Sequence, residues 1–224
     1  MLEEIKAIIW KDLASELRTK EIFLSMFVFA VLTIIIFIFS IDLRVVNKGD
    51  VAPAAIWVAI VFSGTIGLNR SFLHELENDC LSGLMLSPMD RSSIYLGKTI
   101  GNLVYMLCME AMILPVFILF FNLDVSVSLL LKLILVIFLG TLGFVSIGTL
   151  LSAMSMKLKA REIMLPILLC TLVIPIIIGS VKVTGSFLDS GGFSEATGWL
   201  KLIGAFDIIF LTASFMIFEH LIQE

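Results

Sequence analysis

Six long apolar runs alternate with short polar connectors along this chain. An α-helix needs about 20 consecutive apolar residues to cross the hydrocarbon core of a bilayer. The pattern therefore predicts six transmembrane helices, at residues 22–41, 51–68, 100–121, 129–151, 163–181 and 200–221. These spans occupy more than half of the chain and leave no room for a separate soluble catalytic domain. We expect an all-α, polytopic integral membrane protein with a single transmembrane domain over residues 1–224.

The first 21 residues follow a different pattern, in which apolar and charged positions repeat with the period of a helix. The apolar positions are Leu2, Ile5, Ile9, Leu13 and Leu17. Such a segment is typical of an amphipathic helix that lies in the membrane interface. Its charges do not fit a cleavable signal peptide, which has an uninterrupted apolar core. The segment is therefore expected to remain on the mature protein.

Residues 69–99, the polar stretch, form the one long interruption between apolar runs. The stretch carries many charges together with an apolar cluster at Leu81, Leu84, Met85 and Leu86. A short helix with charges on one side and leucines on the other can dock into a groove on a soluble partner. The same pattern is also typical of a helix that lies on the lipid headgroups. The pattern alone leaves both interpretations open.

The distribution of lysine and arginine predicts the orientation, because cytoplasmic loops of membrane proteins carry an excess of both. If the termini share one side, that side holds Lys6, Lys11, Arg18, Lys20, Arg70, Arg91, Lys98, Lys157, Lys159 and Arg161. The other side holds Arg44, Lys48, Lys132, Lys182 and Lys201. This excess predicts that both termini and the polar stretch are cytoplasmic. Residues 181–199, which are rich in glycine and serine, are then expected to form an outer loop.

Composition agrees with this class of protein. Hydrophobic residues make up 59% of the chain and charged residues 15%, with a mean hydropathy of +1.11, far outside the usual range of soluble domains. The three cysteines are scattered, so neither a disulfide framework nor a metal site is expected.

Two features of the sequence could be mistaken for sites that this chain is not expected to contain, a phosphate-binding loop and a haem site. Residues 97–99 spell Gly-Lys-Thr, but the first glycine of a phosphate-binding loop is replaced by Ser92. Lys98 is instead expected to anchor a helix end at the cytoplasmic interface. His74 and His220 lie away from the middle of the spans, which disfavours haem ligation by imidazoles. We expect no enzyme activity and no cofactor bound by the chain itself.

Two carboxylates, Glu110 and Asp207, fall inside predicted spans. Ionisable groups are costly there and raise a functional hypothesis by default. They could line a polar cavity, or they could hydrogen-bond to neighbouring Ser and Thr side chains and hold helices together. The structural interpretation is favoured, because no intramembrane lysine or arginine lies close in sequence to either carboxylate.

Pairs of small residues recur at the spacing of one helical turn. They are Ser63 and Gly67, Gly97 and Gly101, and Gly148 and Ser152. In lipid, small residues let helix backbones approach closely. We therefore expect these pairs to form packing surfaces, either within the bundle or across a dimer.

Several segments resemble the CcmB family, the haem exporter permease subunits of bacterial cytochrome c maturation. The resemblance rests on PAAIWVAIVFSGTIGL at 53–68 and on the NRSFLHELENDCLSGLMLSPM that follows it. Further matches are LGTLGFVSIGTLLSAM at 139–154, LPILLCTLVIPIIIGS at 165–180 and WLKLIGAF at 199–206. Together they cover most of the chain from residue 53 onward.

The resemblance implies a six-span permease of the ABC-2 exporter type in the bacterial cytoplasmic membrane. Its implied partners are a second copy of itself, a cytoplasmic ATP-binding subunit, a haem-handling membrane subunit and a small single-span subunit. ATP would bind the partner subunit, and the complex as a whole would handle haem. No nucleic-acid partner is expected. The implied ATPase-coupling residues are Arg70, Phe72, Glu75, Leu76, Glu77, Leu81, Leu84, Leu86 and Pro88.

Two other classes of transporter could account for a bundle of six spans. An ABC-2 permease that exports a lipid, drug or polysaccharide would have the same fold. A secondary transporter is disfavoured, because the sequence shows no internal repeat and no mid-membrane cluster of coupling residues. Within the family that the chain resembles, the absence of mid-membrane histidine favours force transmission over conduction of haem.

Overall fold

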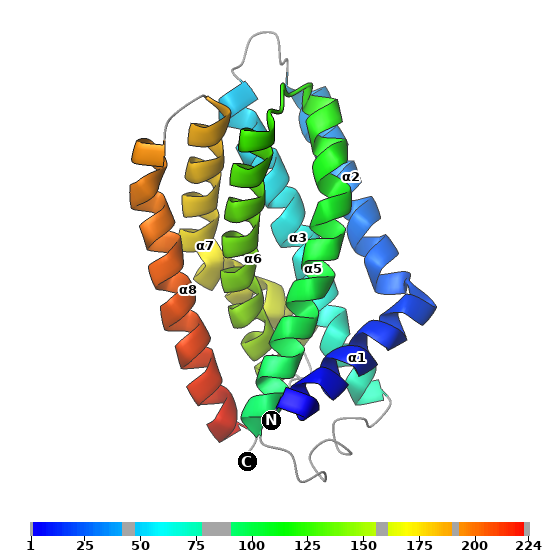
Figure 1. Ribbon diagram of the computed structural model, residues 1–224. Helices are drawn as coiled ribbons and strands as arrows, with labels where there is room; N and C mark the ends of the chain where they lie inside the picture. The colour runs from blue at the N-terminus through cyan, green and yellow to red at the C-terminus, as the bar shows by residue number, and fades with distance from the viewer. Residues whose placement is uncertain (1, 42–47, 78–90, 156–160, 190–192, 222–224) are drawn as a thin grey trace.

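The computed structural model describes residues 2–41, 48–77, 91–155, 161–189 and 193–221, and they form a bundle of long helices (Figure 1). The helices are α1 (Leu2–Thr19), α2 (Glu21–Ser40), α3 (Lys48–Glu77), α5 (Arg91–Phe121), α6 (Val127–Ser155), α7 (Arg161–Leu188) and α8 (Phe193–Leu221). All but α1 contain a segment long and apolar enough to cross a membrane. The predictions of an all-α fold and of six spans are therefore confirmed.

Five of the six spanning helices, all but α2, are longer than the apolar runs that predicted them. Helix α5 has 31 residues and α3 has 30, whereas about 20 suffice to cross a bilayer. Adding residues to an existing helix costs little once its first turn has formed. The expectation that 181–199 is a loop is consequently wrong for most of that segment, because α7 continues to Leu188 and α8 begins at Phe193.

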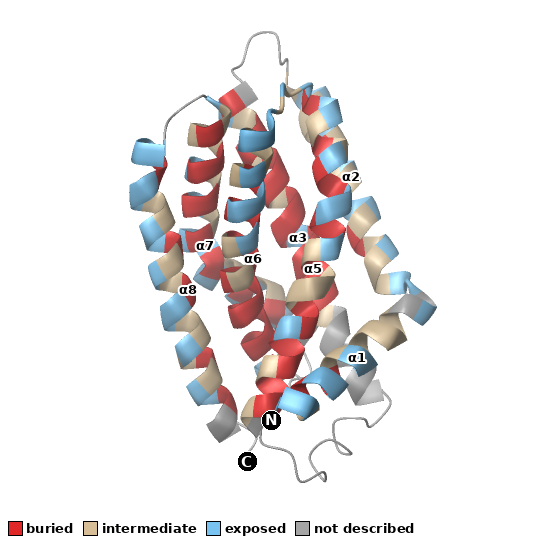
Figure 2. Cartoon of the chain, viewed as in Figure 1, coloured by how far each residue is buried: buried red, intermediate tan, exposed pale blue. Residues whose placement is uncertain are grey.

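The centre of the bundle is formed by α3 and α6, whereas α2 and α8 are its most exposed spans. In an 18-residue apolar segment of α3, 72% of the residues are buried, compared with 17% in the corresponding segments of α2 and α8. Helix α6 packs against α3, α5, α7 and α8. Figure 2 shows the resulting pattern of buried inner faces and exposed outer faces. Apolar side chains on the outer faces are normal for a protein whose solvent is lipid.

The predicted packing role of the small residues is confirmed at three contacts within the chain. A methyl group added at Gly67 would lie 2.5 Å from the sulfur of Met26 on α2. One added at Gly97 would lie 3.0 Å from Cβ of Ile8 on α1. One added at Gly148 would lie 2.3 Å from Cδ1 of Leu68 on α3. These glycines therefore bring helices of one bundle together.

Candidate functional site

The polar stretch begins as a direct extension of a spanning helix. Residues 69–77 continue α3 without a break, and 91–99 form the first turns of α5. The expected separate helix is therefore wrong for these two parts, because no glycine or proline interrupts 68–77. Five candidate coupling residues lie on the final turns of α3: Arg70, Phe72, Glu75, Leu76 and Glu77. The other four, Leu81, Leu84, Leu86 and Pro88, lie outside the described residues.

The end of α3 is fixed to the central helix α6 directly before the polar stretch. Leu68 is buried, and its side chain occupies the space above Gly148. The hydroxyl of Ser152 donates a hydrogen bond to the carbonyl oxygen of Leu68 at 3.3 Å. A displacement of the last turns of α3 would therefore act on α6 through both contacts.

Helix α1 covers the first turns of α5 (Figure 1). Lys98 is only 1% exposed, and its ammonium lies 2.8 Å from Oδ2 of Asp12 on α1. The expectation that Lys98 anchors a helix end at the membrane interface is therefore wrong. The amphipathic pattern of α1 is confirmed, but part of its polar face pairs with α5.

A second polar contact fixes α1 one turn further along. The hydroxyl of Tyr105 donates to Oε1 of Glu16 at 3.1 Å. The same oxygen accepts the backbone amide of Phe23 at 3.1 Å, in the first turn of α2. Lys20, between the two helices, has a positive φ of 55°, which makes the sharp change of direction. Glu16 therefore links α1, α2 and α5 at one point.

The two intramembrane carboxylates approach the middle of α6 from two different helices. Glu110 on α5 accepts a hydrogen bond from the Thr141 hydroxyl at 2.6 Å through Oε1. Its other oxygen, Oε2, has no hydrogen-bond partner among the described residues. The bond to Thr141 supports the interpretation that Glu110 holds helices together.

Asp207 on α8 is 5% exposed and lies against Gly143 of α6. A methyl group added at Gly143 would lie 2.2 Å from Oδ1 of Asp207. Neither carboxylate oxygen has a hydrogen-bond partner within the described parts of the chain. The expected bond to a neighbouring serine or threonine is therefore not made by Asp207.

The opposite end of the bundle is held by contacts that the sequence did not indicate. The indole N–H of Trp57 on α3 donates to the Thr184 hydroxyl on α7 at 3.0 Å. The ammonium of Lys132 lies 5.5 Å from the ring centre of Phe187 and 5.3 Å from that of Phe193, within range of a cation–π interaction. These contacts join the ends of α3, α6, α7 and α8.

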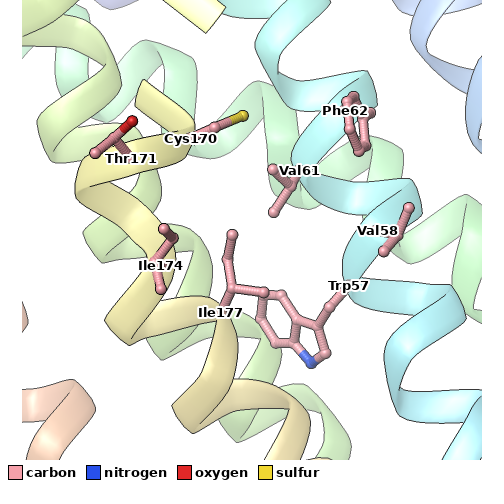
Figure 3. Close-up of a pocket in the computed structure, with 8 residues that line it drawn as sticks. All are labelled: Trp57, Val58, Val61, Phe62, Cys170, Thr171, Ile174 and Ile177. Atoms are coloured by element: carbon pink, nitrogen blue, oxygen red, sulfur yellow. The ribbon is translucent and has the colours of Figure 1, made fainter. Parts of the chain in front are cut away.

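An apolar groove of about 260 Å³ lies between α3 and α7 (Figure 3). Its lining is Trp57, Val58, Val61, Phe62, Cys170, Thr171, Ile174 and Ile177. The Thr171 hydroxyl donates to the carbonyl of Ile167, so its polarity is already satisfied. Across the described residues, no three His, Cys, Asp or Glu side chains come together as a metal site would require.

Comparison with known proteins decides the family. The family model of the CcmB protein matches residues 3–223. The chain belongs to the CcmB family. It is also 25% identical over 189 residues to heme exporter protein B of Haemophilus influenzae. The aligned residues make up 84% of this chain and 82% of that protein. The resemblance noted in the sequence is thus confirmed, and this CcmB-family chain is a multi-pass membrane protein.

Proposed function

We propose that this chain is the membrane subunit of an ATP-driven exporter complex that serves cytochrome c maturation. Its task would be to couple ATP hydrolysis in the cytoplasm to haem delivery, or to release of a haem-loaded chaperone, on the periplasmic side. Membership of the CcmB family and the similarity to a protein named heme exporter protein B support haem as the cargo of the complex. The ATPase would be a separate chain.

The observation that carries this proposal is the continuity between the polar stretch and two spans. Residues 69–77 belong to α3 and residues 91–99 to α5. A partner that binds the residues between them would act directly on two membrane helices. Leu68 then passes this motion to α6 through Gly148 and Ser152. The structure thus offers a continuous mechanical connection from the polar stretch to the centre of the bundle.

The orientation is part of the same proposal. The start of α1, the end of α8 and the ends of α3 and α5 that flank residues 78–90 lie at one end of the bundle (Figure 1). Ten of the fifteen basic residues belong to that end by the expected topology, and basic residues favour the cytoplasm. We place the termini and the polar stretch in the cytoplasm and the ends of α7 and α8 near Leu188 and Phe193 in the periplasm.

We further propose that this subunit transmits force and does not conduct haem itself. The groove between α3 and α7 is apolar, and its lining contains no histidine. Of the imidazole, thiolate and thioether groups that hold haem iron in proteins, the described lining offers only the Cys170 thiol and no second axial ligand. In this proposal a second copy of the chain completes the permease, and haem is handled by the complex, which includes a haem-handling membrane subunit and a small single-span subunit.

Copurification of the ATP-binding subunit tests the docking role of the polar stretch. Truncating a buried anchor at an interface typically costs about 2 kcal/mol or more, whereas exposed charges at the rim cost little. We expect Leu81→Asp and Leu84→Ala to reduce the amount of ATPase that copurifies, and Asp90→Ala to leave it unchanged. Each variant is first confirmed to be inserted and folded. Wild-type recovery of the ATPase with Leu81→Asp would overturn the docking role and favour a helix on the lipid surface.

A further inference from the structure

The buried face of α8 contains two polar residues, at positions where burying an apolar side chain would cost less free energy. The buried residues in the described part of this helix recur at intervals of seven and four positions, which places them on one face: Ala196, Ile203, Asp207, Ser214 and Phe218. Asp207 is 5% exposed and Ser214 is 1% exposed. Both side chains are therefore enclosed almost completely by neighbouring helices.

Ser214 lies beside a group of hydroxyls contributed by α5. The phenol of Tyr95 donates to the carbonyl oxygen of Ser146 on α6 at 3.1 Å. The hydroxyls of Thr99 and Ser214 lie near the Tyr95 oxygen. Thr99 is 3% exposed, and its hydroxyl and that of Ser214 lie beside the Tyr95 oxygen without the distance and angle of a full hydrogen bond to any described residue.

The cluster of hydroxyls around Tyr95 and the carboxylate of Asp207 lie about one turn of α6 apart. The Ser146 hydroxyl donates to the carbonyl oxygen of Gly143 at 2.9 Å, and Gly143 is the residue against which Asp207 lies. Tyr95, Thr99, Ser146, Ser214 and Asp207 therefore follow a single seam between α5, α6 and α8. We call this set the polar seam.

Other ionisable groups do not neutralise Asp207. From α5, the titratable groups that face α6 are Tyr95 and Glu110, and Glu110 is bound to Thr141. Helix α6 presents Gly143, and α7 presents Ile176, whose Cδ1 would lie 2.4 Å from a methyl group at Gly143. Among the described residues, Asp207 has no ion pair within salt-bridge distance.

We propose that the polar seam binds water inside the membrane and that Asp207 is a proton-binding site within it. An ionised carboxylate without a donor is very costly in an apolar interior, whereas a protonated carboxyl group is uncharged and donates one hydrogen bond itself. Buried waters typically bridge polar groups that otherwise lack partners. Water along the seam would satisfy Thr99 and Ser214 and would give Asp207 a route for proton exchange.

Infrared spectroscopy of the full-length chain in lipid vesicles tests both parts of the proposal. A protonated carboxyl group has its own C=O band, which shifts when its hydrogen is exchanged for deuterium. We expect such a band to be lost in Asp207→Asn and kept in Glu110→Gln. After transfer to D₂O, the wild-type band should shift as soon as the buffer has exchanged.

The role of the seam is tested with a matched pair of variants on the same helix. Ser214→Ala removes one hydroxyl of the seam and should slow the deuterium shift of the Asp207 band several-fold. Thr212→Ala is the control, because Thr212 is exposed and its hydroxyl donates to the carbonyl of Ile208. This control should exchange at the wild-type rate.

Two results would overturn the proposal. If Asp207→Asn removes no protonated-carboxyl band, Asp207 does not hold a proton. If the band is present but exchanges equally fast in Ser214→Ala and Thr212→Ala, or does not exchange in D₂O, the seam does not supply water to Asp207. Both measurements use this subunit alone, so their results do not depend on whether the ATPase docks on the polar stretch.

Discussion

The buried ion pair between Lys98 and Asp12 predicts that α1 is locked onto α5, and that the two single substitutions have unequal effects. Lys98 has a side chain that is 2% exposed, whereas that of Asp12 is 22% exposed and also lies 3.3 Å from the Lys11 ammonium. Replacing Asp12 with asparagine removes a carboxylate from a fully buried ammonium. Replacing Lys98 with methionine leaves Asp12 near water and near Lys11. Asp12→Asn should therefore be the more damaging change.

The expected free-energy costs of the two substitutions follow from the difference in burial between Lys98 and Asp12. Breaking a buried ion pair by removing one partner typically costs about 3–5 kcal/mol, and we expect about 3 kcal/mol for Asp12→Asn. Lys98→Met instead leaves the partly exposed Asp12 near water and beside the Lys11 ammonium, so we expect about 1 kcal/mol for this substitution. Because about 1.4 kcal/mol corresponds to a tenfold change in an equilibrium constant, the opening of α1 should increase roughly a hundredfold and roughly fivefold, respectively.

The opening can be measured through a cysteine placed beneath α1. Ser93 is fully buried in the first turns of α5, so Ser93→Cys, with Cys80, Cys108 and Cys170 replaced by serine, should react with a maleimide mainly when α1 opens. The labelling rate should rise strongly with Asp12→Asn and weakly with Lys98→Met. Lys182→Met, which changes an exposed lysine, is the control and should have no effect. Equal labelling rates in all four proteins would refute the locking role of the pair.

Three further predictions follow from other parts of the molecule. A cysteine at Ser186 should be labelled by an impermeant thiol reagent from the periplasm and one at Ser92 should not, because of the basic-residue asymmetry; reversed labelling would contradict the orientation. Gly148→Ala should lower the free energy of unfolding by about 1–3 kcal/mol through overpacking on Leu68. Gly204→Ala should be neutral or stabilising, because no described residue outside its own helix backbone lies within 4 Å of the new methyl group; equal effects of the two substitutions would contradict the packing role of Gly148. The purified chain alone should show neither ATPase activity nor stoichiometric haem absorption, and either signal would contradict the assignment of both tasks to partner subunits.

The six spans could be predicted because a bilayer imposes a length and a composition on any helix that crosses it. Residues 22–41 correspond closely to α2 at Glu21–Ser40. The ends of the other spans could not be placed in the same way. Residues 69–77 and 182–188 are polar enough to suggest loops, yet both continue helices, because backbone hydrogen bonding propagates a helix where no proline or well-placed glycine stops it.

The polar contacts depend on residues that are distant in sequence, and the local pattern contains no signal for them. The sequence around Lys98 indicated an anchor at the membrane interface. Its ion-pair partner, Asp12, lies on another helix and could not be recognised from the local pattern. The small-residue spacing at Gly97 predicted a close approach but did not identify α1 as the neighbour. Glu110 and Asp207 were recognised as unusual because they are ionisable groups in apolar runs, but only the structure distinguishes the bonded Glu110 from the unbonded Asp207.

In the proposed mechanism, movement of α3 passes through Leu68 and Gly148 to α6, and this coupling can be measured directly. The measurement is the amount of haem-loaded chaperone released per ATP hydrolysed by the reconstituted complex. Gly148→Leu disturbs the contact between α3 and α6 while leaving residues 69–99 intact, and Gly204→Leu is the control for an added side chain. We predict that Gly148→Leu retains the ATPase and hydrolyses ATP but releases little chaperone per ATP, whereas Gly204→Leu behaves as wild type. Wild-type release per ATP with Gly148→Leu would contradict the account.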